Sequence, residues 1–323
     1  MLQEVHVGHK HLADYQSVVA RSLVEEIREL AEDLREARVL HINATSFGGG
    51  VAEILYTLVP LMCDVGLDAQ WRVIMAEQEF YEGTKVIHNA LQGNPEGLSD
   101  EQKQVFEKNN RMAAESLAGG FDFVVVHDPQ PLLIRHYGGA GDSKWVWHCH
   151  IDTSTPNREV ADYLLPYVSQ FDSAIFTMEQ YVFNGLDIPV NVFMPAIDPL
   201  STKNMALSPD DADYVVGQFG IEPGRPLMLQ ISRFDPWKDP LGVIDAYGIV
   251  KKDFAAVRLA LVGSMATDDP EGWSFFTNTV EHAGDDGDVI ILSNLNNVGN
   301  LEVNAFQSRA DVVIQKSIRE GFG

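Results

Sequence analysis

Two basic residues of this sequence, Arg233 and Lys238, have the types and spacing needed to hold a diphosphate. They follow the short apolar run Leu227–Ile231 and precede a helix-like segment. Arg offers a planar fork of N–H donors and Lys a point charge, and the two together suit phosphate oxygens. The competing interpretation is a pair of surface cations bonded to Asp235 and Asp239. We favour the phosphate, because Lys and Arg are scarce here and these two stand at a strand end, where α/β folds bind ligands.

A run of glycines points in the same direction with less force. Gly48-Gly49-Gly50 stands between the apolar run Val39–Ile42 and a second helical pattern. Residues without Cβ let the backbone approach a ligand, and a helix N-terminus offers free N–H groups to an anion. The run is neither a Walker loop nor GxGxxG, and a purely structural turn explains it equally well. We therefore assign Gly49 and Gly50 to phosphate binding only in combination with the other residues.

Acids and histidines stand at further strand ends. Asp128 follows the apolar run Phe123–His127, His150 follows Trp145–His148, and Glu320 lies in the turn near the end of the sequence. The Glu320 carboxylate could accept hydrogen bonds from sugar hydroxyls, and Asp128 and His150 are placed to reach the same cleft. A helix cap is the alternative for Glu320, and a structural role is the alternative for a histidine at a strand end.

The grouping of His148, Cys149 and His150 raises the question of zinc. Alternation along a strand puts Cys149 on the opposite sheet face from both histidines, and no fourth ligand stands at metal spacing. We therefore expect no metal and no cofactor. With Cys63 the only other cysteine, a disulfide framework is excluded.

The composition limits the kinds of molecule that the protein is expected to bind. The 323 residues include 47 acids and 23 Lys plus Arg, a formal charge of −24, so bulk nucleic-acid or anionic-membrane binding is disfavoured. No apolar run approaches the roughly 20 residues of a membrane-spanning helix, and the N-terminus lacks the order of a signal peptide. We expect a cytoplasmic protein whose partners are small molecules, and a homodimer is compatible with this interpretation.

Alternating strands and helices must position these residues. The stripe Leu23, Ile27, Leu30 and Leu34 predicts an amphipathic helix within Ser17–Arg35. After it the sequence predicts strands and helices in alternation, hence an α/β fold with mostly parallel sheets. The predicted strands are Val39–Ile42, Trp71–Met75, Phe123–His127, Trp145–His148, Ala174–Thr177, Val192–Met194, Leu227–Ile231, Arg258–Val262, Val289–Leu292 and Asp311–Gln315.

Two prolines in Met194–Ser201 interrupt this alternation, and we place the domain boundary there. The predicted domains are 1–198 and 199–323. Their facing strand ends should frame a cleft. The sequence ends at a strand-to-helix turn, so we expect the second domain to be truncated at its C-terminus.

The chain resembles, over nearly its whole length, retaining glycosyltransferases of the two-Rossmann-domain GT-B type (glycosyltransferase family 4). Within them it is similar to the trehalose synthase and retaining trehalose phosphorylase group. The motifs that carry the resemblance are the glycine loop His41–Gly50, Val126–Pro131, Trp147–Asp152, Ser232-Arg233 with Lys238, and Gln315–Gly323.

This resemblance implies a role for each domain and for each matched position. Residues 1–198 would form the acceptor domain and residues 199–323 the nucleotide-sugar-binding domain. Arg233 and Lys238 would hold the donor diphosphate and stabilise the leaving group, with the Gly49 and Gly50 amides facing the same phosphates. The remaining roles concern the sugars and the base: Glu320 would bind hydroxyls of the donor glucose, His150 would lie beside the reacting carbon, Asp128 and Asp152 would contact substrate, and Leu295, in Asn294–Val298, would lie near the base.

The resemblance also implies a reaction: retaining transfer of glucose between a nucleoside-diphosphate glucose and glucose, making or cleaving trehalose, with front-face attack. The second acid of the family's E-x7-E motif falls beyond Gly323. Trehalose phosphorolysis, an inactive fragment that only binds the nucleotide sugar, and an epimerase of the same architecture are the alternatives. The Trp147–Asp152 motif makes the epimerase the weakest of them.

Overall fold

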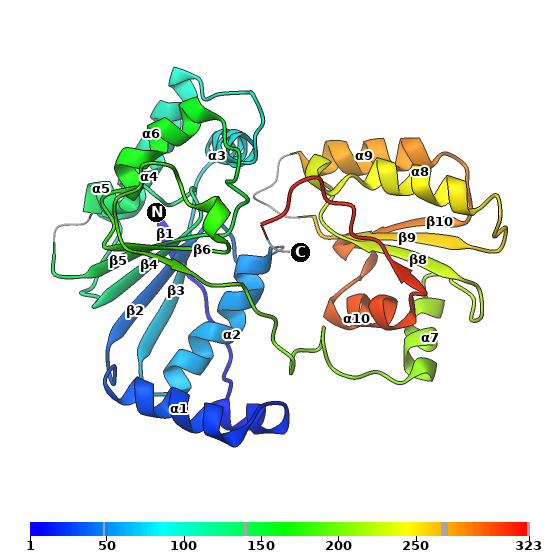
Figure 1. The fold of residues 1–323 in the computed structure, drawn as a ribbon, viewed down its shortest axis with the longest axis horizontal. Coiled ribbons are helices and arrows are strands. Elements are labelled where there is room, and N and C mark those ends of the chain that lie inside the picture. The colour runs from blue at the N-terminus through cyan, green and yellow to red at the C-terminus, as the bar shows by residue number, and fades with distance from the viewer. Residues whose placement is uncertain (48, 139–140, 266–270, 322–323) are drawn as a thin grey trace. The chain divides into compact units, whose positions relative to one another are not determined.

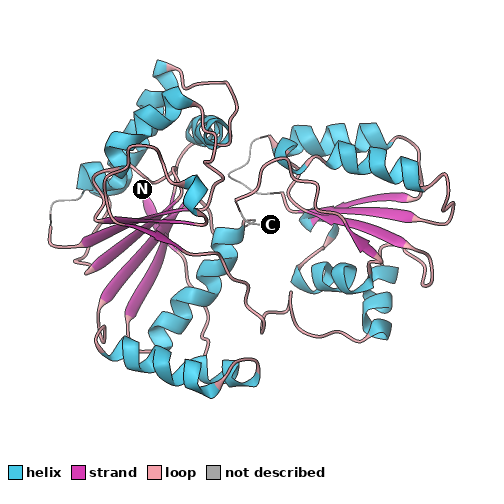
Figure 2. Ribbon diagram, in the orientation of Figure 1, coloured by secondary structure: helices cyan, strands magenta, loops and turns pink. Residues whose placement is uncertain are grey.

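The computed structural model describes residues 1–47, 49–138, 141–265 and 271–321. The chain divides into two compact units, Met1–Ile197 and Asp198–Gly321, where the sequence had suggested a division after residue 198. Each unit is a parallel α/β sheet with helices on both faces, as Figure 2 shows, so the expected fold class is confirmed. No helix among the described residues is both long and apolar enough to cross a bilayer.

The first unit is built on one twisted sheet with the strand order β1-β3-β2-β4-β5-β6-β7 (Figure 1). β1 pairs antiparallel to β3, and every other pairing is parallel. The carboxyl ends of β2, β4 and β5 therefore lie side by side at one edge. The strands are β1 (Leu2–Glu4), β2 (Arg38–Asn43), β3 (Asp68–Ile74), β4 (Phe123–His127), β5 (Lys144–Cys149), β6 (Ser173–Phe176) and β7 (Val190–Val192).

Two apolar cores cover the opposite faces of this sheet. One core packs the sheet residues Leu40 and Trp147 against α3–α6, and the other packs Val39 and Trp71 against α2. Burial of these side chains supplies the main stabilisation of the unit. The helices are α1 (Arg21–Glu32), α2 (Gly50–Asp64), α3 (Gln78–Leu91), α4 (Asp100–Glu115), α5 (Ile134–Gly138) and α6 (Arg158–Val168), with 3-10 turns η1 (Leu12–Ser17) and η2 (Glu179–Tyr181).

Helix α1 forms where the sequence predicts it, but its apolar stripe does not enter the core. Leu23, Ile27, Leu30 and Leu34 stay exposed, from 36% for Ile27 to 66% for Leu30, while Val24 and Ala31 are the residues that α1 buries. The period of a pattern fixes which residues share a helix face, but not which face packs. Strand β7 also differs from expectation, since it covers Val190–Val192 rather than Val192–Met194.

The second unit has a fully parallel sheet in the order β10-β9-β8-β11. One core packs it against α7 and α10, and the other packs it against α8 on the opposite face. Parallel pairing of β8 with β11 brings the segments that follow them to one edge. The elements are α7 (Pro209–Gly217), β8 (Leu227–Ile231), η3 (Pro236–Lys238), α8 (Pro240–Val250), β9 (Arg258–Gly263), α9 (Gly272–Ala283), β10 (Val289–Ser293), η4 (Asn294–Asn296), α10 (Asn300–Arg309) and β11 (Val312–Val313).

Candidate functional site

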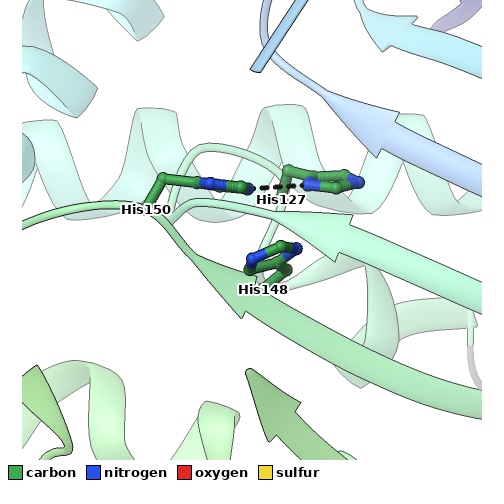
Figure 3. A group of neighbouring side chains, drawn as sticks. All are labelled: His127, His148 and His150. Carbon is green, nitrogen blue, oxygen red and sulfur yellow. Dashed lines mark hydrogen bonds between the residues drawn. The ribbon is translucent and has the colours of Figure 1, made fainter. Parts of the chain in front are cut away.

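A row of three hydrogen-bonded imidazoles crosses the carboxyl edge of the first sheet. His41 Nδ1 lies 3.0 Å from His127 Nε2, and His127 Nδ1 lies 3.0 Å from His150 Nε2. The three residues come from β2, from the last position of β4 and from the segment directly after β5, which are adjacent strands. We call His41, His127 and His150 the histidine row. Figure 3 shows His127 and His150 joined by their hydrogen bond. The ring of His148 is tilted by 32° against that of His150, with 3.9 Å between the centroids.

Burial keeps these imidazoles uncharged. Removal from water disfavours the cationic form, and it lowers the pKa of His41 and of His150 to about 4 and that of His148 to about 3. The pKa of His127 falls well below its ordinary value, again first through burial and then through the neighbouring histidines. At neutral pH the edge therefore presents ring nitrogens that can donate or accept, but no positive charge.

Asp128 connects the row to the sheet. Its backbone has φ of 62°, in the left-handed region that most residues avoid, and Asp tolerates it better than most. Its carboxylate accepts the backbone N–H of His150 at 2.8 Å, and its carbonyl accepts the indole N–H of Trp147 at 3.0 Å. A strained residue with such specific contacts holds the turn after β4 against the turn after β5. The sequence-predicted pair Asp128 and His150 is therefore brought together.

Asp152 and Cys149 are both buried. The Asp152 carboxylate accepts the N–H and the hydroxyl of Ser154 at 3.0 and 2.6 Å. Cys149 lies in the core on the opposite face of the sheet, as alternation predicted. The third imidazole close to His148 and His150 is His127 instead, with one nitrogen of each of the three within 4.8 Å of the others.

The second unit carries a cluster of charges at the edge where β8 and β11 end. Lys238, at the end of η3, forms an ion pair with Glu320, whose carboxylate also accepts the Gln315 amide at 3.1 Å and the Ser317 hydroxyl at 2.9 Å. The guanidinium of Arg233 lies 3.9 Å from the buried carboxylate of Asp235. We call Arg233, Lys238 and Glu320 the charged cluster.

Local sequence chemistry holds the cluster in place. Asp235 caps η3 by accepting the Trp237 N–H at 2.8 Å, which sets the turn between Arg233 and Lys238. Asp239, with φ of 48°, accepts the Gly242 N–H at 3.0 Å and so caps α8, which starts two residues after Lys238. The partner of Asp239 is Lys316, not Lys238.

The last residue of β9, Gly263, is required by a close backbone approach. A Cβ there would lie 2.6 Å from the Ser232 carbonyl and from the Phe234 ring. The segment that begins with Ser232 and carries Arg233 therefore packs directly on the end of the neighbouring strand.

The remaining sequence-predicted residues lie at the start of α2 and in η4 after β10. Gly49 is the N-cap of α2 and Gly50 its first residue, and a Cβ on either would meet nothing within 4 Å. No packing inside the described chain therefore demands these two glycines. Leu295, in η4 after β10, is largely exposed. Gly48, Phe322 and Gly323, which belong to the predicted motifs, lie outside the described residues.

Comparison with known proteins decides the family. The model of the trehalose synthase N-terminal domain matches residues 41–183, and that of glycosyl transferases group 1 matches residues 215–323. A trehalose synthase of Rubrobacter xylanophilus is 58% identical over 329 aligned residues, covering 100% of this chain and 79% of that protein. The chain belongs to the trehalose synthase family.

More distant proteins agree with the family. A trehalose phosphorylase of Pleurotus pulmonarius is 27% identical over 98% of this chain and 50% of its own length. A solved trehalose-6-phosphate synthase superposes with a TM-score of 0.68 over 89% of this chain and 80% of its own, at 13% identity, so it shows the fold alone. The chain is thus a glycosyltransferase with two α/β domains of the GT-B type, and the stated resemblance is confirmed.

Sequence reasoning missed two residues of the site. His41 and His127 were included only inside longer motifs, although they lie in β2 and at the end of β4, and β2, β4 and β5 are consecutive neighbours in the sheet. Histidines at or near the carboxyl ends of three successive sheet neighbours were the available signal. It needed the strand order, which the sequence did not provide.

Proposed function

We propose that this trehalose synthase family member is a retaining glucosyltransferase that makes or cleaves trehalose, exchanging glucose between a nucleoside diphosphate and a second glucose. The observation that carries the proposal is the 58% identity to a trehalose synthase across the full chain. The charged cluster supports it independently, because Arg233, Lys238 and Glu320 converge at one strand edge with the chemistry that a sugar diphosphate needs.

The residues divide the reaction between them. The bond from C1 of the donor glucose to the diphosphate breaks, and a bond from C1 to a hydroxyl oxygen of the acceptor glucose forms. The departing phosphate takes the hydroxyl proton. Charge builds on that phosphate in the transition state, and Lys238 and Arg233 stabilise it there. Glu320, which is ion-paired to Lys238, accepts hydrogen bonds from donor hydroxyls when the diphosphate binds Lys238.

The uncharged edge of the first unit serves the sugars. His150 and Asp128 are proposed to contact donor or acceptor glucose, with Gly49 and Gly50 donating backbone N–H groups to the phosphates. Asp152 is proposed to contribute less to sugar binding, because its carboxylate already accepts a hydrogen bond from the Ser154 hydroxyl. Leu295 is exposed at the end of β10, at the edge where a base could stack.

The proposed partners of the protein are small-molecule sugars and nucleotide sugars. We propose that it needs no cofactor and that it is located in the cytoplasm. The charge of −24 supports the exclusion of nucleic acid and of anionic membranes. Homodimer formation remains compatible with it.

Phosphorolysis of trehalose is the second candidate, and the likeness to a trehalose phosphorylase supports it. Inorganic phosphate would then bind Arg233 and Lys238 in place of the nucleotide. A chain that only binds the nucleotide sugar is the third candidate.

One set of incubations separates these functions. The protein is mixed with glucose and a panel of nucleoside-diphosphate glucoses, and in parallel with trehalose and phosphate, and products are read by NMR. Trehalose formed from one donor supports the synthase and identifies the base. Glucose 1-phosphate from the parallel reaction alone supports the phosphorylase. No product in either reaction, with calorimetry still showing that the diphosphate binds and that Lys238→Ala abolishes binding, supports binding only.

A further inference from the structure

The two hydrogen bonds of the histidine row must point the same way. Each imidazole is neutral, because burial disfavours the cation, and a neutral imidazole has one N–H and one bare nitrogen. His127 uses both nitrogens in the row, Nε2 toward His41 and Nδ1 toward His150. If it donates to one neighbour, it accepts from the other. The proton on His127 therefore decides the tautomers of both His41 and His150.

The environment of His41, at the end of the row away from His150, determines the donor-to-acceptor direction of the two hydrogen bonds. His41 Nε2 is buried and has no hydrogen-bond partner among the described residues. If the row ran from His150 toward His41, this atom would carry an N–H buried without an acceptor, which folded proteins rarely allow. In the opposite direction it carries only a lone pair, which costs less. The row therefore runs from His41 Nδ1–H to His127, and from His127 Nδ1–H to His150 Nε2.

We propose that His41 and His127 are positioning residues that hold His150 as its Nδ1–H tautomer, so that it offers an N–H donor to an oxygen of the bound sugar. Within the described residues, His150 Nδ1 has no hydrogen-bond partner, and the side chain is partly exposed. The backbone of His150 is fixed independently by Asp128. The role toward sugar rests on the proposed function, whereas the tautomer does not.

The same imidazoles could instead hold a transition metal, since His127, His148 and His150 each offer a nitrogen within 4.8 Å of the others. Zn²⁺ would need one bare nitrogen from each histidine, about 2.0–2.1 Å from the ion. His127 Nδ1 and His150 Nε2 already share a proton at 3.0 Å, and using either atom as a ligand would break this hydrogen bond. The geometry favours the hydrogen bond, and metal binding is an outcome that the test can reveal.

The direct test is the tautomer of His150 in the free protein. Histidine is labelled with ¹⁵N, and long-range ¹H–¹⁵N correlations are recorded at neutral pH, with His150→Gln identifying the signal. We expect a proton on Nδ1, the tautomer that free imidazole side chains disfavour in water. A proton on Nε2 would overturn the proposal. Because no turnover is involved, this outcome is independent of whether trehalose is the product.

A matched pair of variants tests the role of His127. Asn and Leu have the same shape, but only Asn can donate a hydrogen bond from about the place of His127 Nδ1. We expect His127→Leu to release His150 to the Nε2–H tautomer and to lower kcat roughly tenfold, the effect of one lost hydrogen bond, with KM for the nucleotide sugar unchanged. His127→Asn should retain the Nδ1–H signal and most of kcat.

Three results would refute this assignment. The first is an Nδ1–H signal that persists in His127→Leu, since His127 would then not set the tautomer. The second is equal kcat in the Leu and Asn variants when both fold by circular dichroism. The third is stoichiometric zinc in the purified protein that shifts the signals of His127, His148 and His150 together. If the Leu variant fails to fold, the wild-type tautomer still decides.

Discussion

The histidine row and the charged cluster occupy equivalent places in their two units, at the carboxyl ends of parallel strands, but they are made from opposite chemistry. The row is neutral and directional, buried at His41 and His127 and partly exposed at His150, with proton positions set by its own hydrogen bonds. The cluster is partly exposed and ionic, with Lys238 17% exposed and paired to Glu320. Parallel α/β sheets put ligands at this edge, and the side chains decide which kind.

Because of this difference, the two edges can bind different chemical groups. Ion pairs at a partly exposed site contribute little net energy, so an incoming diphosphate can take Lys238 from Glu320 at small cost. A row of neutral imidazoles cannot attract phosphate, but it can orient a hydroxyl. The account therefore assigns the nucleotide to the charged cluster and the sugar hydroxyls to the row.

The largest effect is expected at the charged cluster. Lys238→Ala should lower kcat about 100- to 1,000-fold, because it removes a preorganised charge from the leaving phosphate. Lys251→Ala is the matched control: Lys251 is also ion-paired, to Asp286 and Asp288, but at the other end of α8, and it should leave kcat unchanged. Steady-state kinetics of both variants checks this, and equal losses would erase the distinction between the two lysines.

The next largest effect should be on the pH dependence of the free energy of unfolding. His41 has a folded pKa of about 4 and an ordinary value of 6.5, so the unfolded chain binds its proton first as the pH falls. The contribution is nearly constant above about pH 7.5, and the free energy of unfolding should fall by about 2 kcal/mol for this histidine alone between about pH 7.5 and pH 5. Urea denaturation at several pH values measures it. His41→Phe should flatten the slope, and an unchanged slope would show that His41 is not the titrating group.

Two variants of Asp128 should distinguish the effect of its left-handed backbone on stability from the effect of its negative charge. Asp128→Ala puts a residue with no capping oxygen in the left-handed region, and it should cost about 1–2 kcal/mol of stability. Asp128→Asn keeps both the conformation and an oxygen for the His150 N–H, so it should stay within about 0.5 kcal/mol of the wild type. Thermal unfolding compares them. If Asn destabilised as much as Ala, the negative charge rather than the turn would be the stabilising feature.

The smallest effect is predicted for Glu320. Glu320→Gln frees Lys238 from its ion pair, so a free nucleoside diphosphate should bind about twofold to fivefold more tightly, the range of a partly exposed pair. Transfer of glucose should fall at the same time, because a ligand of the donor hydroxyls is weakened. Calorimetry and kinetics on one sample check both signs. Weaker diphosphate binding would mean that Glu320 supports the phosphate site rather than competing for it.

Much of the fold could be predicted from the sequence because its periodicity is local. The bounds predicted for β4 and β8 are those observed, and the segment after β8 lies at an edge as expected. The exposed stripe of α1 shows the limit, since a periodic pattern contains no information about which neighbour covers it.

The site was harder to predict because its contacts are long-range. Lys238 and Glu320 are 82 positions apart, and His41 and His127 are 86 apart. Each pair depends on sheet order: β8 beside β11, and β2 beside β4. Single residues at strand ends could be found from the sequence, but their partners could not.

The most direct test of the division between the two edges is calorimetric binding of the nucleoside diphosphate to Lys238→Ala and His127→Leu. The account predicts that Lys238→Ala loses most of the affinity and that His127→Leu retains that of the wild type. It also predicts that the wild-type affinity falls as salt rises, as expected for an ionic site. Wild-type affinity in Lys238→Ala, or an equal loss in both variants, would contradict it.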